Sequence, residues 1–116
     1  MFYPHAAPPR GGKDGCRVHH GSWRPFEGQE AEFLERWREF AEWTAALPGA
    51  GRAVLARDLR DPERFVSFVA WADIESVRAW KGSPEFKPRM SKVQEHIDKF
   101  APTELEVVEV VNASET

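Results

Sequence analysis

Two histidines stand side by side early in the chain, at His19 and His20. Residues 17–24 alternate as a β-strand does, so neighbouring side chains point to opposite faces. The two rings therefore cannot easily bind one metal ion, and no Asp or Glu stands beside them to complete a site. We expect no metal centre. Cys16 is the only cysteine, which excludes a disulfide or a thiolate cluster within one chain.

His19 is the candidate general base. By strand alternation it shares a face with Gly21 and Trp23, whereas His20 faces the other side. An unperturbed imidazole has a pKa of about 6.5, which suits proton removal near neutral pH. On a half-buried strand, a histidine is more often a hydrogen-bonded structural group, and that alternative stands beside the catalytic one.

Aromatic side chains are frequent, and five of them are tryptophans. Such rings suit a pocket for a flat apolar molecule. Trp37 and Trp71 fall on apolar positions of a predicted helix and a predicted strand, so both also fit a plain core role. The rings that we consider for a pocket are Trp23, Trp37, Trp71, Trp80 and Phe86.

The hydrophobic pattern predicts the elements that must position these residues. Strands are expected over residues 17–24, 53–59, 64–71 and 105–111, and a long amphipathic helix over 28–47. Asp73 is the expected N-cap of a short helix that carries Trp80. A further helix begins at Ser83-Pro84, continues through Phe100 and is ended by Pro102.

The most characteristic segment is residues 68–90, which read FVAWADIESVRAWKGSPEFKPRM. An apolar strand passes through an acidic turn into one Trp-bearing helix and then into another. This segment resembles the antibiotic biosynthesis monooxygenase (ABM) family of small α+β proteins, and the resemblance covers roughly residues 16–111. The predicted order is β-α-β-β-α-β with a split second helix, which is the ferredoxin-like fold.

The sequence also predicts a homodimer. The strands over 64–71 and 105–111 are apolar on both faces, and such strands need cover on both sides. Helices can cover only one face of a four-stranded sheet, so we expect the sheet of a second subunit to cover the other. The family resemblance likewise implies a dimeric α+β barrel.

Length and charge limit the remaining functions. The 116 residues form one domain over 16–116, preceded by an arm of residues 1–15 that is rich in Pro and Gly. The net charge of −3 gives no basic surface for nucleic acid. No run approaches the roughly 20 apolar residues that cross a membrane, and the start of the chain has no signal pattern. We therefore expect a cytoplasmic protein.

One branch of the family degrades haem with an Asn on the first strand, a Trp on the short helix and an iron-binding His on the next helix. When WKGSPEF and EGQEAEFLERW are aligned with that pattern, Trp80 matches the Trp. The Asn position falls on Gly21 and the His position on Met90. A lone thioether is a weak ligand for haem iron, so this arrangement is disfavoured. A haem site altered to use Met90, His19 or His96 remains an alternative.

The other branch oxidises polycyclic phenols to quinones without metal or flavin. A deprotonated phenol can itself pass an electron to O₂, so the protein has only to bind, desolvate and position it. The resemblance thus implies an oxidoreductase, a cofactor-independent monooxygenase acting on a phenol or polyketide-like substrate. A non-catalytic dimer that binds a small ligand is the third hypothesis, because no strong acid–base constellation stands out.

The candidate residues follow from these arguments. Arg89 would pair with an anionic substrate oxygen, although such an arginine is more often solvated. Gly21, Trp80 and Met90 are expected around a common cavity. We assign His19 and Trp80 to catalysis, and to substrate binding Gly21, Trp23, Trp71, Phe86, Arg89 and Met90.

Overall fold

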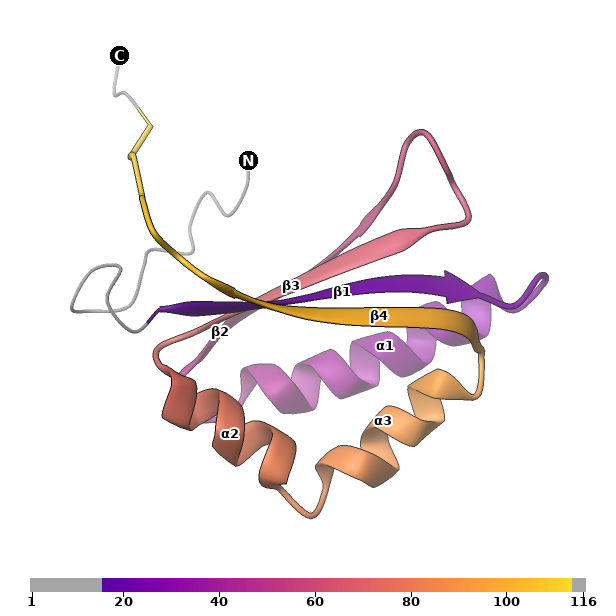
Figure 1. The fold of residues 1–116 in the computed structure, drawn as a ribbon. Helices are drawn as coiled ribbons and strands as arrows, with labels where there is room; N and C mark the ends of the chain where they lie inside the picture. Colours follow the sequence, from indigo (N-terminus) through magenta and orange to yellow (C-terminus); the bar gives the residue numbers. More distant parts are fainter. Residues whose placement is uncertain (1–15, 114–116) are drawn as a thin grey trace.

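The computed structural model describes residues 16–113. Its four strands form one open antiparallel sheet in the order β2-β3-β1-β4, and the helices lie together on one face of it (Figure 1). In chain order the elements are β1 (Arg17–Pro25), α1 (Glu30–Ala45), β2 (Ala50–Arg57), β3 (Phe65–Trp71), α2 (Ile74–Gly82), α3 (Phe86–Gln94) and β4 (Ile97–Glu106). The predicted α+β class and ferredoxin-like order with a split second helix are confirmed. The predicted arm of residues 1–15 lies outside the described residues.

Strand β1 is central and pairs antiparallel with both β3 and β4. His19, Gly21 and Trp23 are buried beneath the helices, whereas Val18 and His20 are half-buried on the opposite face. This alternation is the one predicted from the sequence. Four rows of side chains cross β3, β1 and β4 on the helix side: Trp71–Arg17–Glu106, Val69–His19–Glu104, Ser67–Gly21–Pro102 and Phe65–Trp23–Phe100.

Local chemistry sets the limits of the helices. Asp73 is the N-cap of α2, as predicted, and its side chain accepts a hydrogen bond from the Ser76 amide at 2.8 Å. Ser83 takes an extended conformation (ψ 138°), which separates α2 from α3. After α1 the chain turns at Gly49, whose φ of +84° is readily adopted only without a Cβ.

The last third of the chain departs from the prediction. Helix α3 ends at Gln94, and β4 covers Ile97–Glu106 rather than residues 105–111. Ile97 and Phe100 continue the helical spacing of α3, but Phe100 stacks on Trp23 with ring centroids 4.2 Å apart, so pairing with β1 overrides the local pattern. Pro102 does not end a helix. It lies within β4, which tolerates a proline because it is an edge strand.

This correction changes the argument for two-sided strands. Val108, Val110 and Val111 follow β4 and are exposed, so the second apolar strand invoked in that argument does not exist. Strand β3 still alternates between a buried face with Val69 and a half-buried apolar face with Phe68. Within residues 16–113, no helix combines the length and apolar character needed to cross a membrane.

Gly21 tests how tightly the sheet packs against the core. A Cβ at this position would lie 2.8 Å from both Ser67 Oγ and Trp23 Nε1, which hydrogen-bond to each other. We predict that Gly21→Ala lowers the free energy of unfolding by about 1–3 kcal/mol, because the added carbon forces these groups apart. Urea denaturation measures the loss. Gly82→Ala is the matched control, since its Cβ would meet nothing within 4 Å; equal stability of the two variants would contradict the prediction.

Candidate functional site

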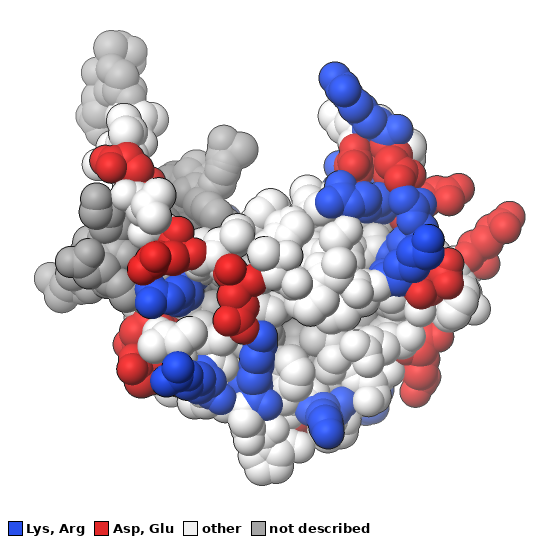
Figure 2. Space-filling view, in the orientation of Figure 1, with Lys and Arg blue, Asp and Glu red and all other residues white. Residues whose placement is uncertain are grey.

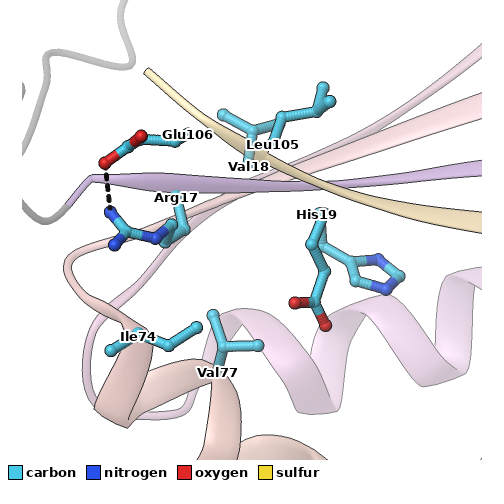
Figure 3. A pocket seen from close by; sticks show the side chains of 8 residues that line it. Arg17, Val18, His19, Ile74, Val77, Leu105 and Glu106 are labelled. Atoms are coloured by element: carbon cyan, nitrogen blue, oxygen red, sulfur yellow. Dashed lines mark ion pairs between the residues drawn. The ribbon is translucent and has the colours of Figure 1, made fainter. Parts of the chain in front are cut away.

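A cavity of about 180 Å³ opens where β1 and β4 meet the start of α2 (Figure 3). Arg17 and His19 point from β1 toward the side on which Ile74 and Val77 of α2 lie, while Val18 and Leu105 lie on the other side of the strands. The full lining is Arg17, Val18, His19, Ile74, Val77, Glu104, Leu105 and Glu106.

His19 is the buried titratable group of this cavity, with 7% of the residue exposed. Its ring meets the Trp80 indole edge-on, with centroids 4.9 Å apart. Residues 16–113 give neither ring nitrogen a hydrogen bond, yet these nitrogens are not among the fully buried unpaired atoms of the described residues, where Trp71 Nε1 is found instead. A histidine with a purely structural role is normally held by such bonds.

The surroundings of His19 keep the ring neutral. Burial, followed by the positive charge of Lys81, lowers its pKa from 6.5 to about 4, although the Glu104 carboxylate acts in the opposite direction. The pKa of an unperturbed imidazole, which the sequence suggested, therefore does not apply, and the ring is a weaker base than that value implied. At neutral pH the ring is uncharged, so one of its nitrogens carries a lone pair.

Glu104 lies directly across from His19 as its partner on β4. Its carboxylate accepts a hydrogen bond from Lys81 Nζ of α2, and this bond is the main cause that lowers the pKa of Glu104. At the mouth of the cavity, Arg17 pairs with Glu106 at 3.7 Å (Figure 3). The cavity thus combines one neutral ring with two ion pairs.

Trp80 connects His19 to the aromatic core. Its indole Nε1 donates to Thr44 Oγ1 at 3.1 Å, which fixes the ring, and its centroid lies 4.9 Å from that of Trp71 and 5.0 Å from that of Phe86. Four of the predicted site residues, His19, Trp71, Trp80 and Phe86, therefore come together. The Nε1 of Trp71 is buried and has no partner among the described residues.

The other predicted residues lie elsewhere. Trp23 belongs to the same hydrophobic core as Trp71 and Trp80, but it contacts Ser67 and Phe100, and together they fill the space beside Gly21. Met90 is buried in the hydrophobic core. Arg89 lies over the Trp43 ring at 5.0 Å and pairs with Glu85 at 3.5 Å, on the surface of α3.

A second, more open cavity of about 440 Å³ lies between α2 and the turn that follows α1. Trp80 lines this second cavity, and its ring contacts that of His19, which lines the first. Gly21 and Met90 line neither of these cavities. The lining of the second cavity is Leu47, Pro48, Asp73, Glu75, Ser76, Ala79, Trp80 and Ser83.

Sequence reasoning missed Glu104, Lys81 and Arg17 as site residues. The usable signal was the alternation along residues 97–106, which places Glu104 on the face of His19 once β4 is positioned correctly. Within the described part of the chain, no group of three His, Cys, Asp or Glu side chains is arranged to hold a metal ion.

Residues 17–89 match the model of the antibiotic biosynthesis monooxygenase family. The match spans more than half of the chain, so this protein belongs to that family. No curated protein matches its sequence.

Several solved structures resemble this chain over most of its length. SnoaB of Streptomyces nogalater, described as a cofactor-independent oxygenase, is 18% identical with a TM-score of 0.75, covering 84% of this chain and 97% of SnoaB. A conserved protein of Methanosarcina mazei is also 18% identical, with a TM-score of 0.74 over 81% of this chain and 94% of its own. At such identities, the likeness establishes the fold alone.

The lowered pKa of His19 predicts a pH-dependent stability. Between pH 6.5 and about 4 the unfolded chain binds a proton at this ring that the folded chain excludes, so stability falls as the pH drops. From about pH 7.5 to about pH 5, the His19 contribution to the free energy of unfolding should fall by about 2 kcal/mol. Urea titrations of wild type and His19→Gln at both pH values measure it. Identical losses in the two proteins would contradict the assignment.

Proposed function

We propose that this protein is a cofactor-independent oxygenase that oxidises a small phenol with O₂ in the cavity beside His19. The observation that carries the proposal is the buried imidazole at the cavity wall, neutral and without a hydrogen-bond partner among the described residues. A substrate hydroxyl placed there meets an unoccupied proton acceptor in a partly desolvated setting.

The reaction begins with proton transfer. The phenol O–H bond breaks as its proton moves to a ring nitrogen of His19, and the developing phenolate is electron-rich enough to pass an electron to O₂. Because the pKa of His19 is lowered, the proton transfer is uphill, and the electron transfer to O₂ draws it forward. Overall, one oxygen atom of O₂ becomes the second quinone oxygen and the other leaves as water. That water carries the hydroxyl hydrogen and the hydrogen of the attacked ring carbon. No external reductant is needed.

The size of the cavity points to a single-ring substrate. Its volume of about 180 Å³ lies below the roughly 300–1,000 Å³ of pockets for drug-sized ligands. Ile74 and Val77 of α2 supply apolar wall on the side of the strands where His19 lies. Trp80, whose indole donates a hydrogen bond to Thr44, packs edge-on against the ring of His19. We assign it the role of positioning His19.

The haem alternative has less support. Met90, at the position matched to the iron-binding His, is 7% exposed and packed in the core. The ring Nδ1 of His96 lies 2.9 Å from Gln29 Oε1. The cavity that His19 lines is smaller than a haem requires. The description of SnoaB as cofactor-independent supports oxidation without a resident cofactor.

We also propose that two subunits pair through the sheet face that the helices leave uncovered (Figure 1). This face carries apolar side chains from every strand, and burying them favours association. Charged side chains gather at the β2–β3 turn and near the C-terminal end, with uncharged surface between them (Figure 2). The apolar residues on this face include Val18, Val54, Val66, Phe68, Ala70 and Leu105.

The test of the chemistry is the variant His19→Gln, assayed by O₂ uptake with a single-ring phenol that the wild type oxidises. We predict that turnover falls by roughly 10²–10⁴-fold, the usual loss for a general base, while binding of the phenol persists. His96→Gln, far from the cavity, should keep wild-type turnover. Unchanged turnover in His19→Gln contradicts the proposal. Tight phenol binding without O₂ uptake in the wild type would instead favour the non-catalytic ligand-binding hypothesis.

The test of the dimer is Val66→Glu, which places a carboxylate on the uncovered face of β3. We predict that the wild type sediments as a dimer at micromolar concentration and that the variant is mostly monomeric, since burying an unpaired charge costs several kcal/mol. Leu59→Glu, in the β2–β3 turn where Leu59 is 90% exposed, is the control. A monomeric wild type would refute the pairing.

A further inference from the structure

We propose that Glu104 is a positioning residue for His19, whose carboxylate holds Lys81 while the cavity is empty and turns to the His19 imidazolium once that ring carries the substrate proton. This inference rests on the proposed oxidation. It assigns a role to a charged group that the proton transfer itself does not use.

The register of the sheet places Glu104 where this role requires it. His19 and Glu104 are direct partners across β1 and β4, so their side chains leave the sheet on the same face. Directly opposed Cβ atoms of an antiparallel pair are about 4.5–5.5 Å apart, within reach of a Glu side chain. Both residues line the same cavity.

The other residues around His19 are positively charged, uncharged, or already paired with another residue. From α2, Lys81 and Arg78 bring positive charge toward Glu104, and Trp80 contributes a neutral ring. From β1, Arg17 pairs with Glu106 of β4. His20 points to the opposite face, and the β3 partner of His19 is the uncharged Val69. Glu104 is therefore the carboxylate directly opposite the ring.

The exchange of partners is energetically reasonable. The Lys81 side chain is 38% exposed, so its ammonium can be released to water at little cost, as for other surface ion pairs. An imidazolium beside Trp80, on a residue that is 7% exposed, has less access to solvent and gains more from a carboxylate. Glu104 stays ionised throughout, because the proton moves only from the substrate oxygen to a ring nitrogen of His19.

The ¹⁵N NMR titration of His19 in the full chain, without substrate, tests the coupling. Lys81→Met should raise the pKa of His19 by roughly one unit, because the positive charge of Lys81 is removed and Glu104 is then free to meet the ring. In the double variant Lys81→Met/Glu104→Gln that rise should disappear. Lys92→Met removes an equal charge from α3 and is the matched control. The proposal is overturned if Lys81→Met titrates like Lys92→Met, or if the double variant keeps the full rise.

O₂ uptake then tests the role in turnover. Glu104→Gln should lower turnover about tenfold, the equivalent of one pKa unit, and Glu104→Asp should restore part of it. Glu106→Gln, at the next position on the same face of β4, should lower turnover less. Turnover independent of Glu104 at every pH overturns the positioning role. Absence of O₂ uptake in the wild type overturns the proposed oxidation instead, and the titration still decides whether Glu104 and His19 are coupled.

Discussion

The alternation of side chains along β1 is the constraint on which the rest of the structure depends. Because β1 is paired on both sides, its inward residues have fixed neighbours, with β3 supplying one and β4 the other. One end of this face is closed by Trp23 stacked on Phe100. The other end stays open beside His19, where Arg17, Glu104 and Glu106 line the cavity. A single strand thus carries both a closely packed part of the core and the cavity.

Burial without hydrogen bonding gives the cavity its chemical character. A polar ring inside a protein normally has a hydrogen-bond partner. His19 has none among the described residues and packs edge-on against Trp80, whose indole is held by its hydrogen bond to Thr44. Burial of the ring is the main cause that lowers the pKa of His19. The aromatic residues that pack the core therefore also form one side of the surroundings of His19.

The sequence predicted the fold wherever local signals agreed with tertiary pairing. Asp73 as a cap and the face of His19 follow from short-range rules, and both match the structure. The limits of β4 could not be derived in this way, because Ile97 and Phe100 satisfy helical spacing and strand pairing equally well, and only contact with β1 decides between them. For the same reason Glu104 was not predicted as a site residue. The face on which a side chain lies can be assigned only when the limits and register of its strand are known.

The short junction of Glu95 and His96 between α3 and β4 has a consequence for how sequences of this kind can diverge. Adding or deleting one residue there would slide β4 by one position against β1, and Thr103 or Leu105 would take the inward place of Glu104. A change of two residues would keep every side chain of β4 on the same face of the sheet. It would change only which residue of β1 each one lies opposite. Length variation at this junction should therefore occur in even steps, which makes it a marker of whether a related sequence can place an acid opposite its first-strand histidine.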